Sequence, residues 1–137
     1  MEERINRILI EADTVYKDAE LLLENERYES SVNRSYYSVF HSAQALLHSK
    51  NIFAKTHSGT RRKFSEIFIK SELLPLECNE WFIKLESSRM ISDYSYDNEV
   101  SPKIAKLAIE YAQKFIAQTK SYFENLEKDS TETDKRE

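Results

Sequence analysis

Apolar and polar residues recur along most of this chain with the spacing of an α-helix. The clearest case is Asn33 to Leu47, NRSYYSVFHSAQALL, where apolar side chains return every three or four residues. Such steps keep side chains on one helical face, so the segment predicts a helix with a buried apolar stripe. The stripe consists of Tyr36, Val39, Phe40, Ala43, Leu46 and Leu47.

Similar patterns predict four more helices around this one. Thr56 and the pair Ser101-Pro102 are start signals, and Asn51 is suited to a left-handed stop. The expected helices span residues 2–24, 30–50, 57–71, 75–93 and 102–126. Because the joints are short, neighbouring helices should be antiparallel, which gives an all-α, up-and-down bundle of about five helices.

The bundle should occupy residues 1–127 as a single domain. Residues 128–137, KDSTETDKRE, contain no apolar side chain and predict a disordered polar tail. The chain has one glycine and two prolines among 137 residues, which favours long helices over a sheet with many turns.

Charge and cysteine content narrow the class of protein. The formal net charge of −4 argues against a protein that coats nucleic acid indiscriminately. The single Cys78 cannot form an internal disulfide, which fits a reducing compartment. No apolar run approaches ~18 residues, and the N-terminal residues lack the order of a signal peptide. We therefore expect a cytoplasmic protein without a membrane span.

Metal and cofactor sites are not expected. None of the three histidines follows a glutamate by three residues, as the paired ligands of di-iron bundles do. One cysteine and three histidines do not supply the ligand spacing of a zinc site. Gly59 alone cannot build a glycine-rich phosphate loop, so we predict neither a metal nor a cofactor.

Arg34 and His41 are the first candidates for chemistry. They lie seven residues apart, which places them on nearly the same helical face, two turns apart. In one interpretation the arginine anchors a carboxylate and the histidine lies beside the core. In the other, the arginine holds a phosphate and the histidine moves a proton.

The segment from Lys55 to Lys63 is a candidate phosphate-binding surface. Lys55, Arg61, Arg62 and Lys63 carry four positive charges, with no acidic residue before Glu66. A helix start at this point adds free N–H groups and a partial positive charge. The alternative is an ordinary solvated helix face.

The segment from Arg89 to Asp97, RMISDYSYD, is the third candidate. Arg89 and Asp93 are four residues apart and suited to an ion pair. Tyr94 and Tyr96 fall in a polar stretch, where tyrosines can stack on bases or accept a modifying group.

Together, NRSYYSVFHSAQALL, KTHSGTRRKF, RMISDYSY and SPKIAKLAIEYAQKFI resemble a HEPN domain over roughly residues 2–126. The chain looks most like the small stand-alone members that are paired with a minimal nucleotidyltransferase. The resemblance implies a dimeric helical bundle, and several such proteins are metal-independent endoribonucleases and toxins. In those, an arginine and a histidine separated by four to six residues form a composite site at the dimer interface.

This chain departs from that motif at its usual position, the end of the fourth helix. The candidate partners of Arg89 are Tyr94, Ser95 and Tyr96, and none is a histidine. Arg34 and His41 have the required spacing, but they lie in the second helix. In some members a partner enzyme adenylylates a tyrosine two residues after the motif histidine, and Tyr96 stands at that distance from Tyr94.

Two hypotheses of function follow. The first is a toxin-like, RNA-directed protein whose polar site comprises Arg34, His41, His57 and Arg89, with the basic segment steering phosphate. The second is a non-catalytic dimeric module that binds a nucleotide or a protein partner. Both include a homodimer, and the first includes a nucleotidyltransferase partner.

Overall fold

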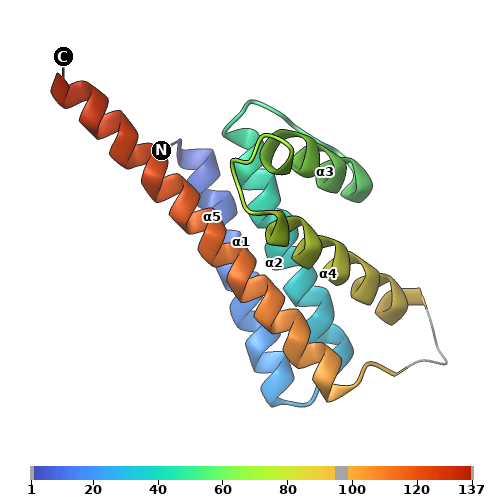
Figure 1. The fold of residues 1–137 in the computed structure, drawn as a ribbon. Coiled ribbons are helices and arrows are strands. Elements are labelled where there is room, and N and C mark those ends of the chain that lie inside the picture. Colours follow the sequence, from blue (N-terminus) through green and yellow to red (C-terminus); the bar gives the residue numbers. More distant parts are fainter. Residues whose placement is uncertain (1, 95–98, 137) are drawn as a thin grey trace.

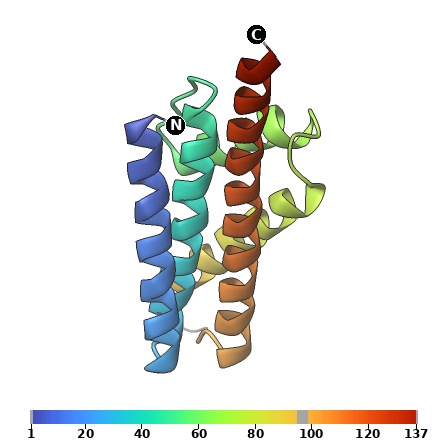
Figure 2. The same ribbon diagram turned by 90° about the vertical axis from the view of Figure 1, so that its left-hand side faces the viewer.

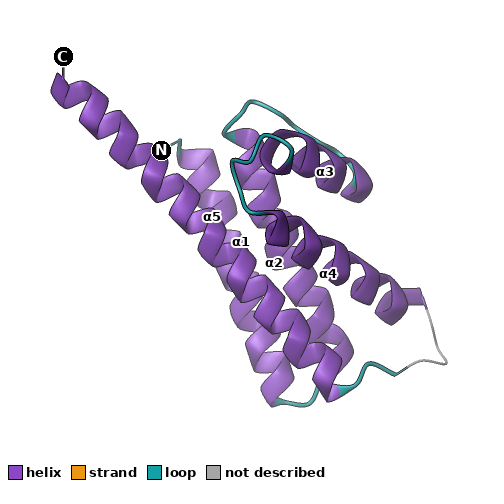
Figure 3. Cartoon of the chain, in the orientation of Figure 1, coloured by secondary structure: helices purple, strands orange, loops and turns teal. Residues whose placement is uncertain are grey.

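The computed structural model of the chain describes residues 2–94 and 99–136, apart from the side chains of residues 92–94 and 130–136. These residues form five α-helices and one π-helical turn, and no strand (Figure 3). The elements are α1 (Glu3–Glu24), α2 (Tyr28–His48), α3 (His57–Phe64), η1 (Ser65–Ile69), α4 (Leu76–Tyr94) and α5 (Pro102–Arg136). The predicted all-α fold of about five helices is confirmed.

Helix α2 lies at the centre of the bundle and packs against α1, α3, α4 and α5. The three longest helices, α1, α2 and α5, lie side by side in both views (Figures 1 and 2). Helix α1 runs opposite to α2, and α4 runs opposite to α5, as predicted for an up-and-down bundle (Figure 1). Helix α3 crosses the end of α2 and joins it to α4. Among the described residues, no helix is long and apolar enough to cross a membrane.

The apolar stripe of α2 forms the centre of the core, as its spacing predicts. Five of its six members are fully buried, and Phe40 is half-buried. A cluster of phenylalanine rings from α3, η1, α4 and α5 completes the core. The ring centroids of Phe64 and Phe115 are 5.3 Å apart, and Phe82 lies 5.8 Å from each. Offset aromatic pairs at these distances contribute beyond the area that they bury.

A second buried face of α2 consists of serines and packs against α1. Ser31, Ser35, Ser38 and Ser42 are all fully buried. Their spacing of four, three and four residues places them on one side of the helix. The Ser31 hydroxyl donates to the Ala19 carbonyl of α1 at 2.8 Å. Small side chains on this face let the backbones of α1 and α2 approach closely.

Helix ends follow the predicted capping residues. The Thr56 hydroxyl accepts a hydrogen bond from the Gly59 N–H at 2.9 Å, and the Ser101 hydroxyl accepts one from Ile104 at 3.2 Å. Asn51 has a positive φ of 58°, as predicted for a left-handed stop after α2. Glu26 and Glu72 also have positive φ values, of 60° and 61°.

Two segments differ from the helices expected from the sequence. The third helix does not continue regularly to residue 71. It changes at Ser65 into the π-helical turn η1, in which the Lys70 N–H donates to the Ser65 carbonyl at 3.0 Å. Helix α5 extends to Arg136 and so includes most of the predicted tail, 128–137. The disorder of that tail stays a prediction.

Candidate functional site

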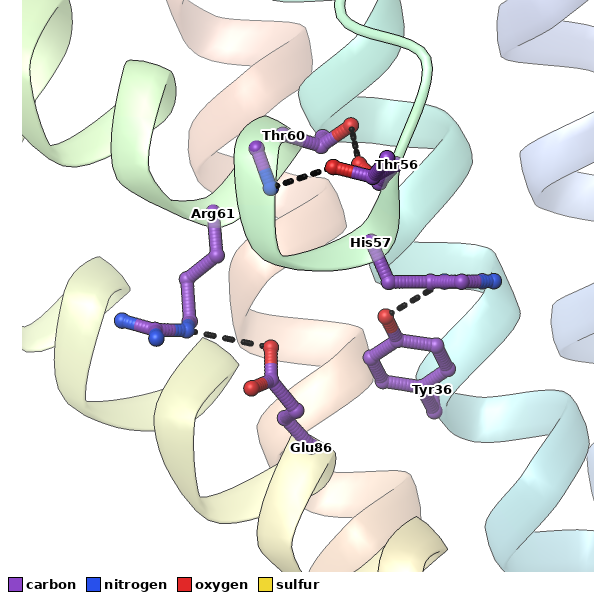
Figure 4. A network of polar contacts seen from close by, with 7 residues as sticks. Tyr36, Thr56, His57, Thr60, Arg61 and Glu86 are labelled. Carbon is purple, nitrogen blue, oxygen red and sulfur yellow. Dashed lines mark hydrogen bonds and ion pairs between the residues drawn. The ribbon is translucent and has the colours of Figure 1, made fainter.

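The start of α3 is fixed to α2 by side-chain hydrogen bonds, and this positions His57. Thr56 caps the helix, and the Thr60 hydroxyl donates to the Thr56 carbonyl at 2.8 Å (Figure 4). From α2, the Gln44 amide donates to the Thr60 hydroxyl at 2.8 Å and to the Ala54 carbonyl at 3.2 Å. The first turn of α3 therefore has a defined place against α2.

His57 binds a buried tyrosine of α2. Its Nδ1 lies 2.9 Å from the hydroxyl oxygen of Tyr36, as Figure 4 shows. The His57 ring also lies 4.7 Å from the Phe40 ring and 5.6 Å from the Tyr37 ring, measured between centroids. The imidazole is thus surrounded by three aromatic rings of α2.

Helix α4 contributes Arg89 and Glu86 to the same place. The Arg89 guanidinium carbon lies 4.8 Å from the centroid of the Tyr36 ring. A cation over an aromatic face at this distance is attracted by the ring's negative face. Glu86 accepts a hydrogen bond from Arg61 Nε at 3.0 Å (Figure 4), which links α4 to α3. We call Tyr36, His57, Arg61, Glu86 and Arg89 the Tyr36 site.

The electrostatics of the Tyr36 site favour neutral forms of its histidine and tyrosine. Burial lowers the pKa of His57, the positive Arg89 lowers it further, and Glu86 opposes them. Burial also raises the pKa of Tyr36 above its ordinary range, although Arg89 opposes this. At neutral pH the His57 imidazole is therefore uncharged and the Tyr36 hydroxyl keeps its proton.

Arg34, Tyr37 and His41 form a neighbouring group on α2, which we call the Tyr37 group. The Arg34 guanidinium carbon lies 5.1 Å from the Tyr37 ring centroid, and the Asn33 side-chain oxygen accepts from Arg34 Nη2 at 2.7 Å. The Tyr37 ring lies 6.4 Å from the His41 ring. Burial lowers the pKa of His41, Glu11 of α1 opposes this, and Arg34 adds to it.

The Tyr37 group adjoins the Tyr36 site but also faces a different surface. The rings of Tyr36 and Tyr37 are 5.2 Å apart, so the two groups are continuous. His41, however, lines a shallow hollow of about 760 Å³ whose other lining residues belong to the N-terminal part of the chain. Those residues are Glu2, Glu3, Arg4, Arg7, Ile8 and Glu11.

The structure therefore brings the four residues predicted for the polar site into one continuous group of contacts. His57 and Arg89 share Tyr36, whereas Arg34 and His41 flank Tyr37. Their part in any reaction stays a prediction.

The basic segment divides into paired and exposed cations. Arg61 pairs with Glu86, and Lys63 Nζ lies 3.7 Å from a carboxylate oxygen of Glu66. Lys55 and Arg62 are exposed. Of these four predicted phosphate-binding residues, Lys55 and Arg62 are thus the more available to a ligand.

Part of the third candidate segment lies outside the described residues. Tyr96 lies outside the described residues, and so do the side chains of Asp93 and Tyr94, although α4 itself runs to Tyr94. Over the described residues, no cluster of three or more histidine, cysteine, aspartate or glutamate side chains is arranged to hold a metal ion.

Sequence reasoning missed three members of this region, for different reasons. The spacing of Tyr36 predicts a ring in the core and gives no sign of a polar role for its hydroxyl. Glu86 precedes Arg89 by three residues, a spacing that places both on one face of α4 and is the signal that could have found it. Gln44 lies beside the α2 stripe, and nothing in the sequence pairs it with Thr60.

Comparisons with known proteins agree with the fold and cover most of the chain. The family model described as "HEPN domain" matches residues 5–122. A protein of Methanocaldococcus jannaschii named "Putative toxin" is 30% identical over 118 residues, which are 86% of this chain and 80% of that protein. A second "Putative toxin" of that organism is 28% identical and covers 90% of this chain and 92% of its own length. A UPF0332 protein of Thermotoga maritima is 32% identical over 81% of this chain and 84% of its own.

Proposed function

This chain belongs to the HEPN family, and from that premise we propose that it is the toxin half of a toxin–antitoxin pair, acting as a metal-independent endoribonuclease. The observation that carries the proposal is the Tyr36 site. It holds an imidazole from α3 and a guanidinium from α4 against one tyrosine of α2. The two relatives named "Putative toxin" support the toxin assignment.

The proposed reaction needs no metal ion or cofactor. The ribose 2′-oxygen attacks the neighbouring phosphorus and the bond from phosphorus to the 5′-oxygen breaks. The 2′-hydroxyl loses a proton and the 5′-oxygen gains one, so the products are a 2′,3′-cyclic phosphate and a 5′-hydroxyl. Arg89 and Arg34 would stabilise charge on the phosphoryl oxygens, and His41 and His57 would serve the proton transfers and hydrogen bonds.

The basic segment would guide the RNA backbone to this site. Lys55 and Arg62 are exposed, and both belong to the segment that begins α3, next to His57. Exposed cations attract phosphate over a Debye length of about 8 Å at physiological salt, and higher salt weakens the attraction.

The proposal includes two partners. One is a second copy of this chain, since exposed apolar side chains remain on α4 and α5. The other is a minimal nucleotidyltransferase in the cytoplasm, which would silence the toxin by adenylylating a tyrosine. Tyr96 is the proposed acceptor on the basis of its spacing in the sequence.

The departure from the family motif favours a second candidate function. No histidine follows Arg89 at the three positions where the motif requires one, which are occupied by Tyr94, Ser95 and Tyr96. A non-catalytic dimeric module would use the same Tyr36 site to bind a nucleotide or a protein partner without cleaving RNA.

Cleavage of RNA in the presence of EDTA distinguishes these functions. The wild-type chain should cleave, and Arg89→Ala should lower the rate by about 10²–10³, the loss typical of removing one donor to a developing oxyanion. His57→Ala and His41→Ala should also lower it. Arg27→Ala is a matched control, since Arg27 is exposed and begins α2 away from the site.

Each outcome decides between the candidates. Cleavage by wild type and Arg27→Ala but not by Arg89→Ala supports the endoribonuclease. A wild-type chain that binds RNA or nucleotide without cleaving it supports the binding module. Equal cleavage by all variants would point to a contaminating ribonuclease or to another site, and either result would overturn the assignment of this site.

A further inference from the structure

The hydrogen bond between Tyr36 and His57 decides what the histidine can do. It joins the hydroxyl of a fully buried tyrosine to Nδ1 of a half-buried imidazole at 2.9 Å. The bond can run in two directions, because a hydroxyl and a ring nitrogen can each donate or accept. The direction fixes which nitrogen of the neutral imidazole carries the proton.

The surroundings of the Tyr36 hydroxyl favour donation to His57. If Nδ1–H donated to the tyrosine, the hydroxyl proton would need another acceptor. Within the described residues, His57 Nδ1 is the hydrogen-bond partner that this hydroxyl has. A buried donor left without an acceptor costs about 1–3 kcal/mol. The tyrosine therefore donates, and Nδ1 accepts.

The charges around the pair keep both groups in the protonation states that this direction requires. The positive charge of Arg89 on α4 disfavours protonation of His57. Glu86 of the same helix favours protonation, but its carboxylate is paired with Arg61 of α3. Burial keeps the Tyr36 hydroxyl protonated by raising its pKa. A neutral imidazole has one N–H, and with Nδ1 accepting, that proton lies on Nε2.

We propose that Tyr36 is a positioning residue that holds His57 with its proton on Nε2, so that His57 offers the site a hydrogen-bond donor and not a base. The part of this proposal that concerns catalysis rests on the proposed endoribonuclease function. Nε2 lies on the side of the ring away from Tyr36 (Figure 4). Together with the Arg89 guanidinium, it presents donors to an anionic phosphoryl oxygen.

The proposal divides the labour between the two histidines of the polar site. With its Nε2 protonated, neutral His57 has no lone pair there to take a proton from a ribose 2′-hydroxyl. His41 is the other imidazole of the polar site, and its contacts in the described residues are with the rings of Tyr37 and Phe40. We therefore assign the role of general base to His41. His57 instead donates a hydrogen bond to the phosphate of the same RNA.

Nitrogen-15 NMR of the histidine side chains tests this directly, without RNA. In the full-length wild-type chain, we expect the His57 signals, identified by their loss in His57→Gln, to show a protonated Nε2 and an unprotonated Nδ1 at pH 7.5. A protonated Nδ1 overturns the proposal. This measurement needs no substitution at Tyr36, so it stands even if Tyr36→Phe folds poorly.

The variant Tyr36→Phe gives a second, independent test, which is the direction in which the pKa of His57 changes. A hydroxyl that donates to Nδ1 stabilises the neutral imidazole, so its removal should raise the pKa of His57. A hydroxyl that accepts from Nδ1–H would stabilise the cation, so the same variant would lower that pKa. Tyr37→Phe is the matched control, because Tyr37 contacts the His57 ring through its own ring, and the His57 pKa should be unchanged.

Activity then separates this inference from the proposed function. If the NMR result holds and RNA is cleaved, the cleavage rate should depend on pH through the titration of His41. His57→Gln should cleave more slowly but keep the same pH dependence. If the NMR result holds and RNA is not cleaved, the proposed function fails while the role of Tyr36 stands. A pH slope that disappears in His57→Gln would make His57 the base and overturn the inference.

Discussion

The single glycine of the chain is required by a neighbouring side chain. The structure shows no glycine with positive φ among the described residues, so Gly59 is not needed for a left-handed backbone. A Cβ added at Gly59 would instead lie 2.6 Å from the Thr56 hydroxyl oxygen, closer than the two atoms can approach. That oxygen is the cap of α3. A side chain at position 59 therefore competes directly with the cap.

We expect Gly59→Ala to weaken the cap, which usually contributes about 1 kcal/mol, and so to destabilise the protein by less than this amount. The better intrinsic helix propensity of alanine offsets part of this loss. Thermal unfolding followed by circular dichroism measures it. Ser58→Ala is the matched control, because Ser58 is exposed in the same turn. Equal melting temperatures of Gly59→Ala and Ser58→Ala would contradict the steric argument.

For single residues, the sequence predicts which face of a helix is buried better than it predicts which side chain a residue contacts. The spacing of the α2 stripe placed the Tyr36 ring in the core correctly. It did not indicate that the hydroxyl would meet His57, 21 residues further along the chain. Such a contact depends on how α3 folds back over α2, and a periodic pattern carries no information about that angle. The residue roles inferred from the family motif stay predictions for the same reason.

Between elements, the serine face of α2 sets how close α1 lies. The fully buried Ser38 hydroxyl donates to the Ser35 carbonyl of its own helix, so its polar group is satisfied without a partner across the interface. Because serine is also small, its side chain takes up little volume between the two helices. This is the most extensive helix–helix interface in the described part of the chain.

We expect Ser38→Leu to cost about 1–3 kcal/mol, because the larger side chain must separate α1 from α2 or adopt a strained rotamer. Urea unfolding curves give the free energy of unfolding. Ser121→Leu adds the same side chain at an exposed position of α5 and should change it by less than about 0.5 kcal/mol. A Ser38→Leu variant as stable as Ser121→Leu would mean that the interface has room.

The limits of the elements were predictable where a residue type signals them. Thr56, Ser101 and Asn51 were identified from the sequence, and each has the predicted role. The π-helical turn at Ser65 was not predicted, because one extra residue in a turn has no side-chain signature. Its effect is visible in the core, where Phe64 and Phe68 are both fully buried on either side of the transition.

For the whole molecule, buried histidines make stability depend on pH. Burial lowers the pKa of His41, His48 and His57 in the folded chain. The unfolded chain has histidines with pKa near ~6.5 and so binds more protons below that pH. The free energy of unfolding should therefore be greatest above pH ~6.5 and should fall as the pH is lowered through that value.

Melting temperatures at pH 7.5 and 5.5 test this, since carboxylates of ordinary pKa, near ~4, titrate below that window. The wild type should melt at a lower temperature at pH 5.5. His57→Gln should show a smaller difference between the two pH values, because one of the three groups is removed. A melting temperature that rises or stays constant on acidification would contradict the argument.

A homodimer is the expected assembly, and α4 with α5 offers a surface for it. Ile83, Ile104 and Leu107 are 41%, 43% and 36% exposed, and they line a hollow of about 300 Å³ between these helices. We expect Leu107→Glu to give a monomer in analytical ultracentrifugation, because dimerisation would bury the new charge. Lys106→Glu is the control, because Lys106 is exposed and does not line the hollow. A Leu107→Glu dimer would place the interface elsewhere.

The left-handed turns after α1 and η1 suggest how this protein could be engineered. Glu26 and Glu72 occupy a conformation that only glycine, and to a lesser degree asparagine, adopts without steric cost. Both side chains are exposed and lie outside the polar site. Glycine at each of these two positions should raise the free energy of unfolding by about 0.5 kcal/mol, and with it the melting temperature. Both positions lie outside the polar site and outside the hollow between α4 and α5. The stabilised chain is therefore a suitable background for variants that would otherwise unfold.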